Sequence, residues 1–296
     1  MIRGLYTATA GMITSERKHQ LVTNNIANLN TVGFKASHAV ARSFPEVLIG
    51  IINGGEGQAQ GQPIGRLHTG VFAEESLNLH VQGDLRATGN PTDFAIRSNI
   101  QVPGVQFDAS GKGVNAAGET VYQPQAFFAV RNGEGQVRYT RDGQFIVDDA
   151  GRLLTSEGYE VLGLNNEPIV FGADTAPGAV AVGPDGRFVS AVTGAPLLGA
   201  DGQALGGLLV VRIDNPYMLI REGNGVFRLE EGADAVPVTA QDAVEVKQGY
   251  LERSNVDAAQ SMVDLMAAVR AYEANQKVVQ AYDRSLEKAV NEVGKV

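Results

Sequence analysis

The sequence predicts an α+β protein: long N- and C-terminal helices pair as a coiled-coil-like domain, with a mainly antiparallel β-domain between them. Three observations predict this class. Near each end, apolar residues recur at alternating steps of three and four. In the middle, short apolar runs alternate with Asp-Gly and Asn-Gly turns. The 36 glycines and 11 prolines suit many turns, and a hydrophobic content of 44% in 296 residues supports a buried core.

The first predicted helix covers residues 1–30. Its apolar or small side chains follow one track, with the spacing typical of helices that pack on other helices: Leu5, Ala8, Met12, Ser15, Val22, Ile26 and Leu29. The Asn-rich run 24–30 and the following Gly33 predict the end of this helix, because Asn and Gly tolerate left-handed backbone.

The second predicted helix covers residues 254–293. Ser254 or Asn255 is expected to cap its N-terminus, with Asp257 placed to favour the helix dipole. The residues on its track are Asn255, Ala258, Met262, Leu265, Val269, Tyr272, Gln276, Val279, Asp283, Leu286, Val290 and Val293.

A helix of this length needs a partner. About 40 residues at 1.5 Å each span roughly 60 Å, which is more than a small domain can cover. The partner helix can come from the same chain or from another. The polar Gln276 and Asp283 on the track either fix the register of pairing or face solvent where the seam drifts.

The middle of the chain carries hairpin signals. Phe127–Arg131 and Gln136–Thr140 flank the turn Asn132–Gly135, and Leu208–Ile213 is expected to be a buried strand. The Gly- and Gln-rich stretch 53–65 is expected to be a loop that is mobile or ordered by a partner.

These elements predict three parts. Residues 1–35 and 250–296 are expected to form a helical assembly domain. Residues 36–84 would be an extended or loop connection, and residues 85–249 the central β-domain.

The sequence predicts no catalytic, cofactor or metal site. Gly54–Gly57 lacks the Gly-Lys-Ser/Thr ending of a phosphate loop, and no G-x-S-x-G elbow occurs. The Asp-Gly turns lack the ligand spacing of a calcium loop. His68 and His80 stand twelve positions apart, outside the spacing of a helical zinc site. Cysteine is absent, which excludes thiol chemistry.

The charge and hydropathy patterns exclude further classes of function. The net charge of −9 without a basic cluster argues against nucleic acid as a partner. No run of 18 apolar residues occurs, so membrane insertion is not expected. The first residues lack an apolar core followed by a small-residue cleavage site, so a cleaved signal peptide is not expected.

Several motifs resemble those of one known family. The run 24–35 (Asn-Asn-Ile-Ala-Asn-Leu-Asn-Thr-Val-Gly-Phe-Lys) resembles the N-terminal motif of the bacterial flagellar axial proteins, the rod and hook family. The run 249–257 (Gly-Tyr-Leu-Glu-Arg-Ser-Asn-Val-Asp) is similar to the motif that opens their C-terminal helix. Further segments similar to the family are 139–145, 151–155, 215–216, 223–227 and 270–277.

Within the family, the chain looks most like a distal rod protein. The Tyr-Thr-Arg-Asp-Gly run from Tyr139 and the chain length favour a rod protein over the hook subunit, which has larger inserted domains. The segment Arg42–Glu46 looks like the rod proteins of Gram-positive bacteria.

The resemblance implies a structural subunit of the flagellar basal-body rod, with no enzymatic activity and no cofactor. Such subunits assemble helically into the drive shaft that carries torque from motor to hook. Their terminal helices form an inner coiled-coil tube. The implied partners are copies of the chain, other axial proteins and, in transit, the flagellar type III export apparatus. The implied location is the basal body in the cell envelope, reached without a cleaved signal peptide.

The predicted assembly interface combines the helical seams with residues of the two terminal motifs. Its members are Leu5, Met12, Val22, Asn25, Ile26, Asn28, Leu29, Gly33, Phe34, Asn255, Met262, Leu265, Val269, Tyr272, Gln276, Val279 and Leu286.

Two alternatives stay open. The chain could be a hook-type or regulatory basal-body protein of the same family. It could also be a secreted β-domain enzyme or binding module with a helical oligomerisation element, which would need a pocket with two facing acidic residues in 85–249. The absence of tryptophan and an aromatic content of 6% count against sugar binding.

Overall fold

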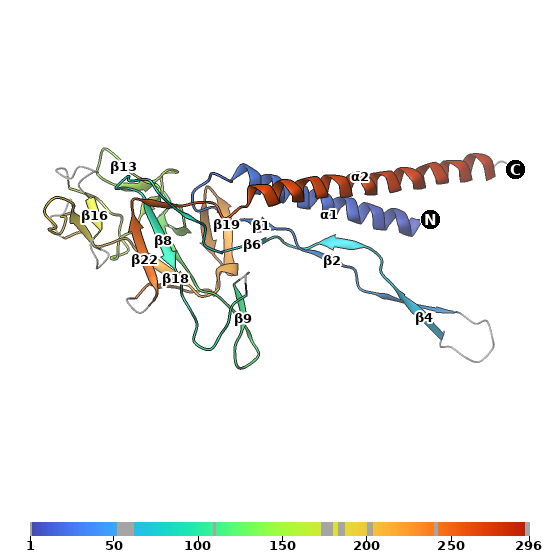
Figure 1. Cartoon of the computed structure of the whole chain (residues 1–296), viewed down its shortest axis with the longest axis horizontal. Helices are drawn as coiled ribbons and strands as arrows, with labels where there is room; N and C mark the ends of the chain where they lie inside the picture. The colour runs from blue at the N-terminus through green and yellow to red at the C-terminus, as the bar shows by residue number, and fades with distance from the viewer. Residues whose placement is uncertain are drawn as a thin grey trace. The chain divides into compact units, whose positions relative to one another are not determined.

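The computed structural model of the chain describes residues 2–51, 62–108, 111–172, 180–182, 187–199, 204–239 and 242–293. It confirms an α+β protein with a helix near each end and a mainly antiparallel β-rich middle (Figure 1). The chain divides into two compact units, each assembled from distant segments. Unit 1 contains Met1–Ala27, Ser37–Leu77 and Asp257–Val296, and unit 2 contains Asn28–Ala36 and Asn78–Val256.

Two antiparallel helices lie side by side in unit 1 (Figure 1). Helix α1 covers Ile2–Ala27, and helix α2 covers Ala258–Lys288 and continues as a π-helical turn over Ala289–Val293. The first helix thus ends before the Asn-rich run does. From Asn28 onward the chain belongs to unit 2.

The cap of α2 differs from the prediction. Asp257 is the N-cap, since its carboxylate accepts hydrogen bonds from the amides of Ala259 at 2.8 Å and Gln260 at 3.0 Å. Asn255 does not cap the helix, because its side-chain oxygen instead accepts a hydrogen bond from the amide of Ala36. The expectation that Ser254 or Asn255 caps α2 was therefore wrong.

Unit 1 also contains short antiparallel strand pairs. Strand β2 pairs with β5, and β3 pairs with β4. Residues 62–65 of the predicted loop 53–65 belong instead to β4, which begins at Gln62; residues 53–61 lie outside the described part of the chain. The strands here are β1 (Ser37–His38), β2 (Ala41–Ser43), β3 (Val47–Ile51), β4 (Gln62–Leu67) and β5 (Val71–Ala73), and β6 (Leu77–Asn78) crosses the boundary between units.

Unit 2 holds the remaining strands. They are β7 (Leu85–Ala87), β8 (Phe94–Ser98), β9 (Lys112–Val114), β10 (Thr120–Tyr122), β11 (Gln125–Arg131), β12 (Val137–Thr140), β13 (Phe145–Val147), β14 (Leu153–Thr155), β15 (Glu160–Val161), β16 (Val180–Val182), β17 (Phe188–Ser190), β18 (Val210–Ile213), β19 (Leu219–Gly223), β20 (Val226–Leu229), β21 (Ala235–Pro237), β22 (Val244–Gln248) and β23 (Tyr250–Glu252). A 3-10 turn covers Pro216–Met218.

The main sheet of unit 2 has nine strands and is centred on β11. The predicted hairpin is confirmed, because β11 pairs antiparallel with β12 and Arg131 lies opposite Val137. On its other side β11 pairs with β15 and β18, which confirms the predicted buried strand near Leu208–Ile213. Outside this sheet, β8 pairs with β22 and β7 pairs with β23.

Strand β11 is covered on both faces. Successive side chains of a strand point to opposite sides of the sheet. Ala126, Phe128 and Val130 accordingly belong to one buried cluster, whereas Phe127 and Ala129 belong to a second. The core of unit 2 therefore has two layers separated by the sheet, which explains why β11 is a continuous apolar run instead of an alternating one.

Candidate assembly interface

The two helices of unit 1 meet through small residues. Gly4 lies against Tyr282, and a Cβ atom on Gly4 would come within 2.1 Å of the tyrosine hydroxyl. Seven residues later, Gly11 lies against Asn275 in the same manner. A heptad step on both helices is the spacing that keeps a seam between paired helices. Glycine at these positions lets the larger side chains of α2 reach the surface of α1.

The buried face of α2 departs from the predicted track at Met262 and Val269. Its buried residues are Ser261 and Ala268. The neighbouring track residues Met262 and Val269 are 56% and 38% exposed. A pattern search favours large apolar residues, whereas close helix pairing at these two positions uses the small residues next to them. Other members of the predicted track do lie on the buried side and are half-buried: Leu265, Tyr272, Val279 and Leu286.

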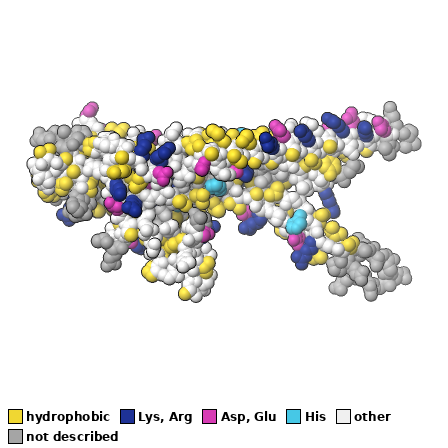
Figure 2. Space-filling model, viewed as in Figure 1, with side chains coloured by type: hydrophobic (Ala, Val, Ile, Leu, Met, Phe, Trp, Pro, Cys, Tyr) yellow, Lys and Arg dark blue, Asp and Glu magenta, His cyan; other side chains and the backbone are white. Residues whose placement is uncertain are grey.

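This departure leaves large apolar side chains at the surface. We call Met262, Val263, Met266 and Val269 the α2 patch; all four are exposed. Figure 2 shows hydrophobic side chains gathered over the first half of α2, while charged side chains are more frequent toward its end. Contiguous apolar surface of this kind is typical of protein interaction sites.

A recess lies beside this patch. It has a volume of about 250 Å³ and is lined by Ser15, Glu16 and His19 of α1 and by Ala268, Val269 and Tyr272 of α2. Val269 belongs to both the recess and the α2 patch, so the two features form one continuous surface.

The predicted interface residues fall into three groups. Met262, Val269 and Gln276 are exposed. Val22, Asn25 and Gly33 are buried. The remaining members are half-buried: Leu5, Met12, Ile26, Asn28, Leu29, Phe34, Asn255, Leu265, Tyr272, Val279 and Leu286.

Asn25 is used inside unit 1. Its side-chain nitrogen donates to the Ser37 carbonyl at 2.8 Å, and its side-chain oxygen accepts from the Ser37 amide at 3.0 Å. This pair of bonds ties the last turn of α1 to the start of β1.

A second exposed apolar surface lies on the hairpin formed by β3 and β4. Val47, Leu48 and Ile49 are all exposed, and Leu48 is 68% exposed. Because consecutive strand residues face opposite ways, neither face of β3 is covered. Ile64 on β4 is exposed as well. Two-stranded hairpins are only marginally stable alone in water, so this one is suited to packing on a partner.

The motif residues around Lys35 and Glu252 meet in a buried ion cluster in unit 2, which we define as Lys35, Arg141 and Glu252. The Lys35 Nζ atom lies 2.6 Å from Glu252 Oε1, and Arg141 Nη1 lies 3.3 Å from Glu252 Oε2. The Lys35 and Arg141 side chains are fully buried, and that of Glu252 is 1% exposed. Sequence reasoning missed this cluster; the available signal was one charged residue inside each of three motifs.

Further hydrogen bonds support the cluster. Lys35 Nζ also donates to the Val81 carbonyl at 2.9 Å, and the amide of Gly83 donates to Glu252 Oε1 at 2.8 Å. Arg141 donates to the Ile96 carbonyl at 3.1 Å. Buried charges are tolerated when they are paired and hydrogen-bonded in this way.

The backbone next to the cluster is equally close-packed. Gly33 has a φ of +66°, and a Cβ atom there would lie 2.5 Å from the backbone carbon of Arg141. The guanidinium of Arg221 lies 4.5 Å from the Phe34 ring centre and donates to the Lys35 carbonyl at 2.6 Å. The motif residues Gly33 and Phe34 thus dock the segment Asn28–Ala36 within unit 2.

Burial changes the ionisation of the cluster. It lowers the pKa of Lys35 to about 8, although Glu252 opposes this shift. Burial alone would raise the pKa of Glu252, but the charges of Arg141 and Lys35 outweigh it and hold that pKa below its ordinary value. The carboxylate therefore stays ionised because the two cations are beside it.

His80 lies beside the cluster among aromatic rings. The ring centres of Phe227, Tyr217 and Phe127 are 5.9, 6.0 and 6.1 Å away. Burial, together with nearby cations such as Lys35, lowers its pKa to about 3. Within the described residues neither ring nitrogen has a hydrogen-bond partner. His80 is therefore a neutral member of the core.

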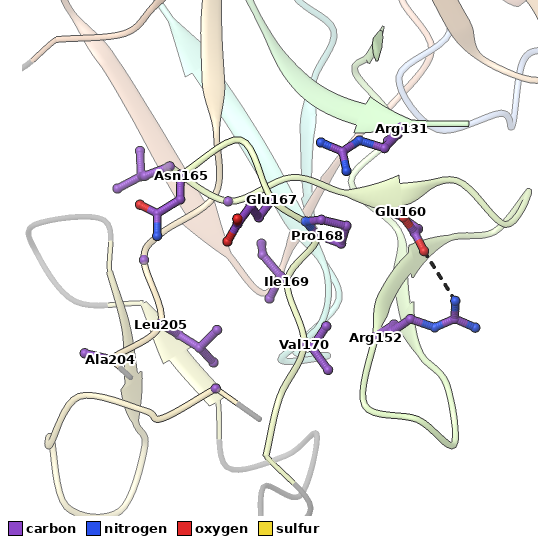
Figure 3. Close-up of a pocket in the computed structure, with 14 residues that line it drawn as sticks. Arg131, Arg152, Glu160, Asn165, Glu167, Pro168, Ile169, Val170, Ala204 and Leu205 are labelled. Atoms are coloured by element: carbon purple, nitrogen blue, oxygen red, sulfur yellow. Dashed lines mark hydrogen bonds and ion pairs between the residues drawn. The ribbon is translucent and has the colours of Figure 1, made fainter. Parts of the chain in front are cut away.

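Acidic residues line two cavities of unit 2. The larger has a volume of about 750 Å³ and is lined by Asp214 and Asp242, which are both paired with Arg212, at 2.9 Å and 2.7 Å. The other has a volume of about 530 Å³, with Arg131, Arg152, Glu160 and Glu167 among its lining residues (Figure 3). Glu160 turns to Arg152, which lies 3.3 Å away, and Arg131 donates to the Asn166 carbonyl. The charged groups around this cavity are largely paired with neighbouring groups of the wall.

Metal and membrane features are also missing from the described part of the chain. No group of three or more His, Asp and Glu side chains is placed there to hold a metal ion. None of its helices is both long and apolar enough to cross a membrane.

Comparisons with known proteins match the terminal segments and the central sheet. The family described as Flagella basal body rod protein matches residues 5–35, and Flagellar basal body rod FlgEFG protein C-terminal matches residues 247–292. Between them, Flagellar hook protein FlgE/F/G D1 domain matches residues 121–190.

Relatives are similar along their whole length. The flagellar hook-basal body complex protein FlhO of Bacillus subtilis is 34% identical, over 100% of both chains. The flagellar basal-body rod protein FlgG of the same organism is 29% identical, over 98% of this chain and 99% of its own. The rod protein FlgF of Rhizobium meliloti is 29% identical, over 99% of each.

Proposed function

The chain belongs to the family of flagellar basal-body rod and hook proteins, and from this premise we propose that it assembles with axial proteins through its terminal helices. It is a structural subunit of the basal-body rod. The finer proposal is that copies of the chain pack helically, with α1 and α2 forming an inner layer in coiled-coil-like geometry.

One observation carries this proposal: the α2 patch stays exposed although α1 and α2 already pair. Helix pairing within unit 1 uses the small residues Ser261 and Ala268. The larger Met262, Met266 and Val269 remain in water. Burying an apolar side chain of this size contributes about 1.5–3 kcal/mol. A helix from a neighbouring copy would bury the patch and the adjoining recess together.

The hairpin of β3 and β4 adds a second proposed contact. Leu48 on β3 and Ile64 on β4 are exposed, and both belong to unit 1 with the helices. Two apolar surfaces on one unit allow each copy to touch more than one neighbour, which a helical array requires.

Further parts of the proposal concern chemistry, partners and location. The subunit carries torque through packed helices and performs no catalysis. Its partners are copies of itself and other rod and hook proteins, and the flagellar type III export apparatus carries it to the basal body in the cell envelope without a cleaved signal peptide. The charged groups around the two cavities of unit 2 are largely paired with neighbouring groups, which does not favour an enzymatic function there.

A position elsewhere in the hook-basal body complex is a second candidate. It is favoured by the name of the Bacillus subtilis relative with 34% identity, which refers to the hook-basal body complex and not to the rod. Immunogold labelling of isolated basal bodies separates the two: label on the rod supports the first, and label confined to the hook side supports the second.

The direct test of assembly is electron microscopy of the purified chain at increasing concentration. Helical rods with the terminal helices nearest the axis are the expected result. A monomer that stays dispersed at the highest soluble concentration, alone and with rod-family partners, would contradict the proposal.

A further inference from the structure

The two ends of the described unit 2 sequence close the same core. The segment Asn28–Ala36 is separated in sequence from the rest of unit 2, which begins at Asn78. At the other end, strand β23 pairs with β7 and carries Glu252 into the core. The Gly33 amide donates to the Glu252 carbonyl at 2.9 Å, so backbone and side chains both join the two segments.

Burying the charged side chain of either segment, Lys35 or Glu252, without the other is energetically unfavourable. An ionised carboxylate moved into a protein core without a partner costs several kcal/mol. Glu252 has two cationic neighbours. One of them, Arg141, also donates hydrogen bonds to the Ile96 carbonyl and to the side-chain oxygen of Gln125. Lys35 is the cation that the N-terminal segment supplies, and its ammonium makes the shorter contact.

Asn255 provides an independent link between the same two segments. Its side-chain oxygen accepts from the Ala36 amide at 2.7 Å, and its side-chain nitrogen donates to the Leu79 carbonyl at 2.9 Å. The Leu79 amide in turn donates to the Ala36 carbonyl at 2.8 Å. The backbone of Leu79 therefore lies between Ala36 of the N-terminal segment and Asn255 near the start of α2.

We propose that the Lys35–Glu252 ion pair is an intramolecular latch that makes closure of the unit 2 β-domain conditional on docking of the segment Asn28–Ala36. The central β-domain is then not self-sufficient: its core is closed only when the segment Asn28–Ala36 and the strand that carries Glu252 are both in place. The latch is a property of the single chain and does not depend on the proposed assembly.

A double-mutant cycle in the full chain tests the latch. Lys35→Met removes the cation and Glu252→Gln removes the anion while keeping an acceptor for Gly83. Lys35→Met leaves Glu252 with Arg141 as its single cation, and Glu252→Gln leaves Lys35 and Arg141 without an anion. We expect each to lower the melting midpoint of unit 2 by about 10 °C. In the double variant Arg141 is the one charge of the cluster that remains and no Lys35–Glu252 interaction is left to lose, so we expect its loss to be at most about half of the sum of the two single losses.

Hydrogen exchange read by mass spectrometry separates a latch from a local contact. In Lys35→Met, protection should fall in β11 and β22, far from the substitution in sequence, while α1 peptides in unit 1 report the other unit separately. The matched control is Lys18→Met, because Lys18 makes a half-exposed pair with Asp264 at 3.9 Å. That variant should leave β11 and β22 unchanged.

Each outcome decides the proposal. Loss of protection across β11 and β22, with a double variant that loses at most about half of the sum of the two single losses, supports it. Loss confined to peptides covering 28–36 overturns it, as does a double variant whose midpoint equals the sum of the two single losses. If Lys35→Met does not fold at all, the double variant decides: a folded double variant supports the latch, and an unfolded one overturns it.

Discussion

Lys35 Nζ lies 2.6 Å from Glu252 Oε1, although 217 positions separate the two residues in the sequence. Both residues belong to terminal motifs that the sequence linked to assembly. In the folded chain these motifs also stabilise unit 2 itself, because they hold its two terminal segments together. Substitutions in them are therefore expected to change folding as well as association.

Gly33→Ala should destabilise unit 2 more than a glycine replacement elsewhere. The new Cβ atom would lie 2.5 Å from backbone of Arg141, which cannot move aside as a flexible side chain can. We expect a loss of about 3 kcal/mol in urea unfolding, of which roughly 1 kcal/mol comes from the positive φ. Gly118→Ala is the control, since Gly118 has a φ of +82° and no neighbour within 4 Å. Equal losses in the two variants would show that the close approach to Arg141 is unimportant.

His80 should make unit 2 sensitive to acid. Its pKa is about 3 in the folded chain against an ordinary 6.5, so the unfolded chain binds the proton first. The stability due to neutral His80 is complete above pH 6.5 and is lost as the pH falls from there toward 3. At pH 5 the loss is about 2 kcal/mol.

His80→Phe should remove that slope, because phenylalanine fits among the surrounding rings and takes up no proton. Urea unfolding at pH 7.5 and pH 5 measures the difference. His38→Phe changes an exposed histidine and should keep the slope of the unmodified chain. A His80→Phe chain that loses as much stability at pH 5 as the unmodified chain would contradict this assignment.

Asp257→Ala should loosen the first turn of α2. The carboxylate satisfies the amides of Ala259 and Gln260, and removal of such a cap costs about 1 kcal/mol. Faster hydrogen exchange at these two amides is the expected result. Ser254→Ala is the matched control, because Ser254 does not cap the helix and accepts only a long 3.4 Å bond from Val256. The reverse order of effects would restore Ser254 as the cap.

Met262→Asp with Val269→Asp should prevent assembly without unfolding either unit. Both side chains are exposed in the single chain, so the charges remain in water until a neighbour covers them. We expect the concentration needed for assembly to rise by more than about tenfold. Ala271→Asp is the control, because Ala271 is exposed and lies nine residues after Met262, which places it on roughly the opposite side of the helix. Sedimentation measures assembly, and circular dichroism measures folding. Unchanged assembly of the double variant would exclude the α2 patch as an assembly surface.

Leu48→Lys should weaken assembly through the hairpin. The side chain is exposed on a strand with neither face covered, so the substitution costs the monomer little. Ser76→Lys adds the same charge at an exposed polar position of unit 1 and is the control. If both variants assemble like the unmodified chain, the hairpin is not a contact surface.

The local patterns predicted the elements well. The hairpin at Asn132–Gly135 and the two helices follow from turn residues and apolar spacing that act over a few positions. The contacts of Gly4 and Gly11 with α2 did not follow, because these residues contribute by being small and carry no apolar signal. Hydrophobicity marked the large residues, which the single chain leaves at its surface.

The ion cluster could not be predicted from periodicity. Lys35 and Glu252 meet only after the sheet has formed, and each looks like an ordinary surface charge in its own segment. Asn255 shows the same limit, because its type suits a helix cap but its hydrogen bonds go to Ala36 and Leu79. Tertiary contacts decided both cases.

The unequal lengths of α1 and α2 give the helix pair a direction. Gly4 near the start of α1 lies against Tyr282, whereas α2 and its π-turn continue to Val293 (Figure 1). The last residues of α2 therefore extend past α1 as a single helix, and the opposite end of the pair has no such overhang. In the proposed assembly, an overhang at one end of the pair favours copies that all point the same way. A filament of such copies would have two chemically distinct tips, and subunits would then add to its two tips at different rates.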